Sequence, residues 1–160
     1  MTEIKNKLIF NLILLFSIFA LLAAYFIQYV LNHQPCNLCL IERIPYILSI
    51  IIISICLFTK KFEKIALIIL STIFFSATLI AIYHFAIEQG IIKESLVCNL
   101  NNENNNLSKE ALLSQLREMP VSCKEVSFKI LGLSLATFNI FISFVLGVTT
   151  TKLLLIYEKK

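Results

Sequence analysis

Four long stretches of the chain consist almost entirely of hydrophobic residues and are separated by polar segments. They cover residues 8–31, 40–59, 65–87 and 130–151. A helix needs about 20 mostly apolar residues to cross the hydrocarbon core of a bilayer. Because backbone polar groups in hydrocarbon must be satisfied within the segment, each stretch is predicted to be a helix. The pattern therefore predicts an all-α membrane protein, with a four-helix transmembrane bundle formed by a single domain over residues 1–160.

The amino-acid composition supports a membrane protein and excludes other classes. Hydrophobic residues make up 58% of the 160 residues and charged residues 15%, whereas soluble domains average about 45–50% and about 25%. So large an apolar excess does not fit into the core of a small soluble protein. The net charge of +4 on so apolar a chain does not indicate nucleic-acid binding. Membrane lipid is therefore the expected surrounding, and no nucleic acid is expected as a partner.

Lysine and arginine are distributed unequally between the two ends of the predicted bundle. The terminal segments and the connection between the second and third spans are rich in lysine and net positive. The two other loops, about residues 32–39 and 88–129, together carry a small negative charge. Basic residues near the ends of spans mark the cytoplasmic side. Both termini are therefore predicted to be cytoplasmic, and both of these loops extracytoplasmic.

Four of the five cysteines fall in the two outer loops. Cys36 and Cys39 lie in the first loop, and Cys98 and Cys123 lie in the second. Disulfides persist outside the cytoplasm, so these four residues are placed where oxidised pairs are stable. Cys56 lies inside the second span among isoleucine and leucine, and we expect it to be an inert apolar residue.

The segment P-C-N-L-C at residues 35–39 places two thiols three positions apart, next to the second span. Thiols at this spacing are close enough to form a disulfide, and the positive end of a helix dipole favours a thiolate. We expect the helix to begin at or just after Cys39, with the positive charge of Arg43 one turn further along. The pattern thus favours a thiolate at the membrane edge.

Three kinds of site are compatible with this spacing: a redox centre, a structural disulfide, or half of a zinc site. Zinc would need two further ligands, which Cys98 and Cys123 or His33 could supply, although the separation of that cysteine pair is not that of a zinc knuckle. The motif does not favour haem attachment, because Leu40, not histidine, follows Cys39. The spacing alone leaves the three alternatives open.

Arg43, at the start of the second span, and His84, at the end of the third, are predicted to lie at similar depth. The second span begins on the outer side and the third ends there, so both residues could converge beside Cys39. A cation, an imidazole and a thiolate at the edge of an apolar bundle would suit a membrane-soluble carbonyl acceptor. Each residue also has a simpler interpretation, as an arginine or histidine at the membrane interface.

The second outer loop contains an asparagine-rich stretch, residues 99–106, followed by a segment of different character. Ser108 is a candidate N-cap for a short amphipathic helix that Pro120 would end. This helix would lie flat on the membrane or pack on the loops of the bundle, and the sequence favours neither arrangement.

The motif P-C-N-L-C-L-I-E-R at residues 35–43 resembles the quinone-reactive motif of the disulfide bond formation protein B (DsbB-like) family. The similarity extends to Y-H at 83–84 with Glu88, S-C-K-E-V-S-F at 122–128, and L-G-L-S-L-A at 131–136. It covers nearly the whole chain, including the four spans and the two outer cysteine pairs. Phe128 stands where the family often carries tryptophan, and some members have glutamine at the position of Glu42.

The resemblance implies a quinone-dependent protein thiol:disulfide oxidoreductase of the bacterial inner membrane, with its redox loops in the periplasm. Cys98 and Cys123 would form the disulfide that oxidises a DsbA-like partner, a soluble dithiol oxidase with a thioredoxin fold. Electrons would then pass to the Cys36–Cys39 pair by thiol–disulfide exchange. All four cysteines are thus implied to be catalytic.

The resemblance also implies a cofactor site in the membrane. Arg43 and His84 would hold the quinone, either ubiquinone or menaquinone, which takes the electrons from the Cys36–Cys39 pair. No metal ligands are implied. The alternative from another functional class is a membrane metal-binding or transport protein that uses the outer cysteines as ligands.

Overall fold

The structure, a computed structural model, describes residues 2–59, 62–93, 123, 129–130 and 133–158. Its elements are α1 (Thr2–Tyr29), α2 (Asn37–Ile41), α3 (Ile44–Thr59), α4 (Glu63–Glu88), β1 (Lys129–Ile130), β2 (Leu133–Ser134) and α6 (Leu135–Glu158). Segments long and apolar enough to cross a membrane cover Lys7–Tyr29, Asn37–Thr59, Glu63–Glu88 and Leu135–Tyr157. These four segments confirm the predicted all-α transmembrane bundle. Cys98 and the candidate amphipathic helix after Ser108 lie outside the described residues.

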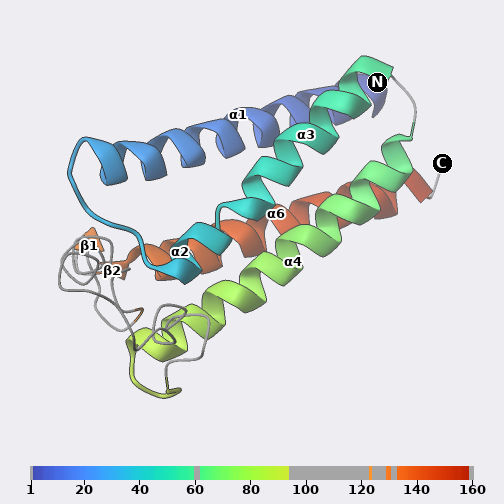
Figure 1. The fold of residues 1–160 in the computed structure, drawn as a ribbon. Coiled ribbons are helices and arrows are strands. Elements are labelled where there is room, and N and C mark those ends of the chain that lie inside the picture. The colour runs from blue at the N-terminus through green and yellow to red at the C-terminus, as the bar shows by residue number, and fades with distance from the viewer. Residues whose placement is uncertain (1, 60–61, 94–122, 124–128, 131–132, 159–160) are drawn as a thin grey trace, which may run out of the picture.

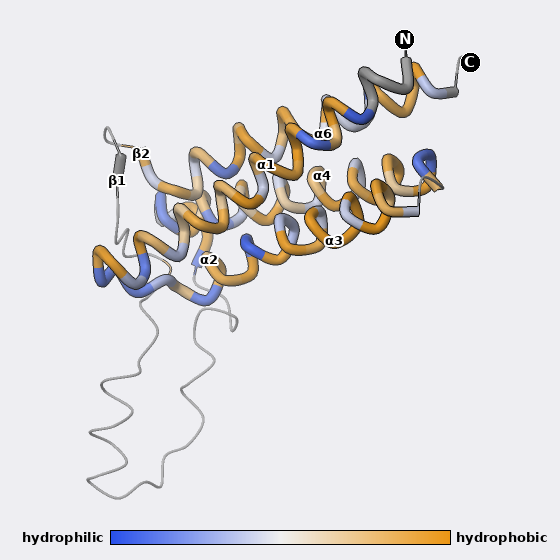
Figure 2. Tube along the Cα trace, turned by 90° about the horizontal axis from the view of Figure 1, so that it is seen from above, coloured by the Kyte–Doolittle hydropathy of each residue, from blue (hydrophilic) through white to orange (hydrophobic). Residues whose placement is uncertain are grey.

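The helices run along one another and place the segments that carry the candidate site residues at one end of the bundle. Both termini lie at the opposite end, near the end of α3 and the start of α4 (Figure 1). The connection from α1 into α2, the last turn of α4 and the β1–β2 hairpin share the other end (Figure 1). Hydrophobic residues dominate the length of the helices, and hydrophilic residues gather toward their ends (Figure 2). This arrangement agrees with two loops on one side of a membrane.

The second span is a short helix, a break and a longer helix. α2 ends at Ile41 and α3 begins at Ile44. Pro45 explains the break, because it has no N–H to donate to the carbonyl of Ile41 and its ring crowds that carbonyl. Proline is tolerated in the first turn of α3, where N–H groups have no partner within the helix. The break leaves Glu42 and Arg43 in the turn between the two helices, where they point in different directions.

The last span begins at Leu135 rather than at residue 130 as expected from hydrophobicity. β1 pairs antiparallel with β2, with Lys129 opposite Ser134 and Ile130 opposite Leu133. A run of apolar residues does not distinguish a strand from a helix when it is short. The chain therefore enters the membrane region through a small hairpin, and its helix starts afterwards.

Small and polar side chains connect the helices inside the bundle. α4 and α6 share the most extensive interface. Gly147 of α6 lies in this interface, where its lack of a side chain lets it pack closely against Phe74 and Phe75 of α4. Since lipid offers no hydrophobic driving force between helices, close packing and interhelical hydrogen bonds hold such bundles together. Two hydroxyl pairs link helices: Ser49 Oγ donates to Ser17 Oγ at 2.9 Å, and Ser71 Oγ lies 2.7 Å from Thr151 Oγ1.

Candidate active site

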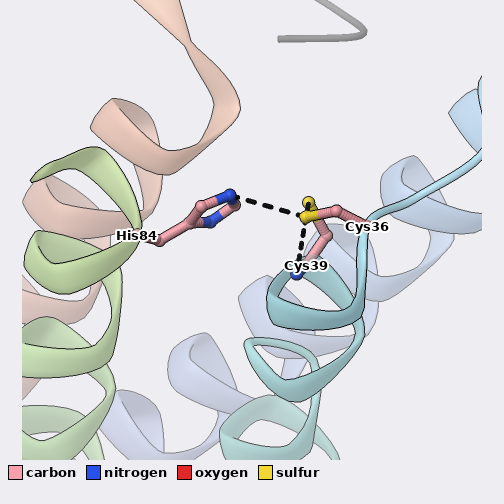
Figure 3. Close-up of side chains that lie close together, drawn as sticks. All are labelled: Cys36, Cys39 and His84. Atoms are coloured by element: carbon pink, nitrogen blue, oxygen red, sulfur yellow. Dashed lines mark hydrogen bonds between the residues drawn. The ribbon is translucent and has the colours of Figure 1, made fainter. Parts of the chain in front are cut away.

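The two cysteines of the first outer loop lie at the start of α2. Cys36 is the N-cap residue, and its Sγ accepts a hydrogen bond from the backbone N–H of Cys39 at 3.2 Å. The two Sγ atoms are 2.6 Å apart (Figure 3). The helix thus begins at Asn37, earlier than predicted, because a thiol accepts the hydrogen bond that an N-cap side chain normally accepts. This geometry holds both sulfurs together at the positive end of a helix.

His84, on α4, approaches this pair from across the bundle. Its Nε2 lies 3.5 Å from Cys36 Sγ (Figure 3). The Sγ atoms of Cys36 and Cys39 and a ring nitrogen of His84 all lie within 4.8 Å of one another. The imidazole is 2% exposed, so the contact is shielded from water. The structure therefore brings three of the predicted site residues together.

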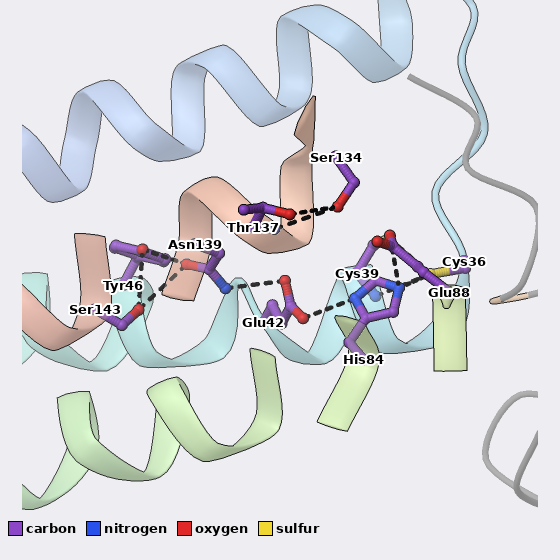
Figure 4. Close-up of polar contacts among 10 residues, drawn as sticks. All are labelled: Cys36, Cys39, Glu42, Tyr46, His84, Glu88, Ser134, Thr137, Asn139 and Ser143. Carbon is purple, nitrogen blue, oxygen red and sulfur yellow. Dashed lines mark hydrogen bonds and ion pairs between the residues drawn. The ribbon is translucent and has the colours of Figure 1, made fainter. Parts of the chain in front are cut away.

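Glu42 holds the other side of the imidazole. Its Oε1 lies 2.8 Å from His84 Nδ1, and its Oε2 accepts from Asn139 Nδ2 at 2.9 Å (Figure 4). Asn139 Oδ1 in turn accepts from the hydroxyls of Tyr46 and Ser143, at 2.5 and 3.2 Å. Asn139 of α6 thus hydrogen-bonds across the bundle, to Glu42 and to Tyr46 of α3. The role of Glu42 was not predicted, although an acidic residue inside a membrane span is itself a signal of function.

Arg43 lies in the same turn but faces α1. Its Nη1 donates to Gln28 Oε1 at 2.6 Å, and its Cζ lies 5.0 Å from the centroid of the Tyr25 ring. Both contacts join the turn between α2 and α3 to the first span. The described contacts of the guanidinium are therefore with α1 and not with the cysteine pair.

A cavity of about 330 Å³ connects these groups. Its polar wall includes Cys36, Cys39, Arg43, His84 and Glu88. Its apolar wall includes Phe16, Phe19, Ile27, Leu135, Phe138 and Ile142, from α1 and α6. Pockets of this size that are mostly apolar, with few polar groups, are typical of small-molecule sites. The cavity has the volume and the lining to admit a small, mostly apolar molecule beside the two sulfurs.

Cys123 packs against the cysteine pair of the first loop. It is 2% exposed and belongs to one hydrophobic cluster with Cys36, Leu38 and Ile87. Its sulfur is in a disulfide. Because Cys98 lies outside the described residues, the Cys98–Cys123 pairing stays a prediction. Cys56, by contrast, belongs to a separate hydrophobic core cluster and lies near the end of α3.

The surroundings of Cys36, which precedes the second span, favour its thiolate. The hydrogen bond with Cys39, followed by the hydrogen bond and charge of His84, lowers the pKa of Cys36 to about 5, against the effect of burial. The thiolate is the reactive form of cysteine. Cys36 is therefore expected to be ionised at neutral pH.

This lowered pKa predicts the pH dependence of alkylation at Cys36. Because only the thiolate reacts, the rate with iodoacetamide should fall to half its plateau value near pH 5 and stay level above it, whereas an ordinary thiol has its midpoint near 8.5. Mass spectrometry of the reduced protein after timed alkylation gives the rate at this residue alone. The same measurement on His84→Gln is the control, with its midpoint at higher pH. A midpoint above pH 7 in the unmodified protein would contradict this description of the site.

Removing Glu42 should destabilise the bundle. Glu42→Ala leaves two buried donors, His84 Nδ1 and Asn139 Nδ2, without their acceptor. An unsatisfied buried polar group costs about 1–3 kcal/mol, so with two such groups we expect the free energy of unfolding to fall by about 2–6 kcal/mol. Thermal or denaturant unfolding in detergent measures the change. The matched control is Glu63→Ala at the far end of α4, where the expected loss is below about 1 kcal/mol. Equal losses of stability in the Glu42 and Glu63 variants would contradict the buried network.

Comparison with known proteins identifies sequence relatives. Residues 6–153 match the family described as "Disulfide bond formation protein DsbB". An uncharacterized protein of Rickettsia prowazekii (strain Madrid E) is 31% identical over 138 residues, which are 84% of this chain and 80% of the relative. The matched range contains every described residue of the site built above.

Proposed function

Because the chain belongs to the family of the disulfide bond formation protein DsbB, we propose that it is a protein thiol:disulfide oxidoreductase that delivers electrons to a membrane quinone. Membership of this family supports a function in disulfide bond formation at a membrane. The observation that carries the finer proposal is the position of the Cys36–Cys39 pair, which opens into an apolar cavity between transmembrane helices. A soluble electron acceptor would not need such a cavity, whereas a lipid-soluble one would.

The residues around the cavity fit a quinone. A quinone ring needs apolar surface on its faces and hydrogen-bond donors at its carbonyl oxygens, and Arg43 and His84 carry donors on the cavity wall. When bound, a quinone would supply an acceptor for two electrons and two protons. His84 Nε2 would accept the proton that leaves Cys36, and Glu42 would keep the ring oriented by accepting a hydrogen bond from Nδ1. Most of the cavity wall around the thiolate is apolar.

Electrons would reach this pair by two thiol–disulfide exchanges. A thiolate of the partner attacks the Cys98–Cys123 disulfide, and the second partner thiol resolves the mixed disulfide, so the partner is oxidised and Cys98 and Cys123 are reduced. A thiolate of this second pair then attacks the Cys36–Cys39 disulfide in the same way and leaves it reduced. Packing of Cys123 in one cluster with Cys36 supports this exchange.

The proposal includes a location and a partner. The chain would lie in the bacterial inner membrane with both termini in the cytoplasm, as the distribution of basic residues predicts. The end of the bundle that carries the cysteines would then face the periplasm. Its partner would be a DsbA-like thioredoxin-fold oxidase, whose strongly oxidising disulfide requires a stronger acceptor such as ubiquinone or menaquinone.

The test is a turnover assay with purified components. The full chain in detergent is given a reduced thioredoxin-fold oxidase and either quinone, and both products are measured. We expect one quinol for each disulfide formed in the partner. Partner oxidation without quinol would contradict quinone as acceptor, and an unchanged partner would contradict the oxidoreductase.

A metal-binding function is the second candidate because Cys36, Cys39 and His84 are close enough to bind one ion. Two thiolates and an imidazole are typical zinc ligands. If metal binding is the function, purified protein should hold about one zinc per chain and show no turnover with quinone. If the oxidoreductase is correct, turnover should persist in the presence of a chelator.

A further inference from the structure

Glu88, the last residue of α4, is an acidic side chain that the proposed function has not used. Its side chain is 6% exposed and its Oε1 lies 3.7 Å from His84 Nε2 (Figure 4). Its Oε2 has no hydrogen-bond partner among the described residues. It also lines the cavity beside the cysteine pair. A buried polar atom without a partner is rare in native proteins and points to a missing proton or ligand.

The two nitrogens of His84 have different surroundings. Nδ1 faces Glu42, a carboxylate whose two oxygens both accept hydrogen bonds, so Nδ1 carries a proton that stays in place. Nε2 lies between Cys36 Sγ at 3.5 Å and Glu88 Oε1 at 3.7 Å. Only Nε2 is thus in a position to exchange a proton, with the thiol on one side and the carboxylate on the other.

We propose that Glu88 is the proton-transfer residue that carries the Cys36 proton from His84 Nε2 to the wall of the cavity. The inference rests on the proposed function. Oxidation of two thiols to a disulfide releases two electrons and two protons, all of which the quinone takes to become a quinol. One proton passes from Cys36 through His84 Nε2 to the Glu88 carboxyl group, which then gives it up on the cavity side. The second proton comes from Cys39 as its sulfur enters the disulfide.

A first experiment detects the proton on Glu88 without any quinone. Infrared difference spectra of the full chain are recorded between the dithiol-reduced and the disulfide form. We expect a carbonyl band of a protonated carboxyl group that is lost in Glu88→Gln and kept in Glu63→Gln, which makes the same change at the other end of α4. Absence of such a band in the unmodified protein, or its survival in Glu88→Gln, would overturn the proposal.

A second experiment measures proton delivery by its rate. In a single turnover, Glu88→Gln should form quinol about 100-fold more slowly, while its thiol–disulfide exchange with the partner and its unfolding temperature stay near normal. Glu88→Asp keeps the carboxyl group and should keep the infrared band and part of the rate. If the glutamine variant does not fold, this aspartate variant tests the proposal in its place. Normal quinol formation in Glu88→Gln would also overturn the proposal.

The two experiments separate failure of this inference from failure of the proposed function. If the unmodified protein forms no quinol, the proposed function is wrong, whatever the infrared band shows. If it forms quinol and the band does not depend on Glu88, the function stands and the role of Glu88 is wrong.

Discussion

Replacing Cys36 with serine is expected to abolish quinone reduction. A serine hydroxyl cannot form the disulfide that releases two electrons, so Cys39 has no partner at the start of α2. We expect turnover with a reduced partner to fall by more than about 1000-fold, to the rate without protein. Quinol formation, followed by absorbance under anaerobic conditions, measures the effect.

The matched control for this variant is Cys56→Ala. Cys56 also carries a reduced thiol, but it lies in the core of the bundle and not at the cavity. Its replacement removes a sulfur from the same span and should leave turnover within about twofold of normal. Turnover of Cys36→Ser at the rate of this control would show that the pair on α2 does not transfer the electrons.

Replacing His84 with alanine should have the second largest effect. The change removes the group that meets Cys36 Sγ and leaves Glu42 Oε1 without its partner. General acid–base catalysis is worth about 100- to 10,000-fold, and we expect quinol formation to slow within that range. The pKa of Cys36 should rise as well, because its hydrogen bond and the nearby charge are lost. Alkylation of Cys36 across the pH range measures this second effect.

Thr78→Val is the control for the histidine variant. Thr78 is buried on the same helix, and its hydroxyl donates to the carbonyl of Phe74 within that helix. The substitution keeps the shape of the side chain, and both the rate and the Cys36 midpoint should stay near normal. If the His84→Ala protein matches this control in both the rate and the Cys36 midpoint, the imidazole has no role in the reaction.

The bundle was predictable from sequence because length and apolarity alone define a membrane span. The cysteine spacing was likewise sufficient to place a thiol pair at the edge of the membrane. The directions of Glu42 and Arg43 were not predictable. They depend on the break before Pro45, which turns one side chain to His84 and the other to α1.

The hairpin before α6 shows a second limit of hydrophobic patterns. An apolar run indicates that a segment avoids water, but it does not mark where a helix begins. The contact between Glu42 and His84 spans 42 positions of the chain, so only the packing of α3 against α4 reveals it. The sequence pointed to the chemistry of the site, and the fold determines which atoms meet.

In the proposed function, the Cys36–Cys39 dithiol gives its electrons to a quinone in the bundle. The most direct test is an anaerobic single turnover of the purified, metal-free chain with both of these thiols reduced and ubiquinone or menaquinone added. We predict one quinol per chain together with a Cys36–Cys39 disulfide, mapped by mass spectrometry. Quinone that stays oxidised beside a reduced pair, or quinol formed without that disulfide, would contradict this electron transfer.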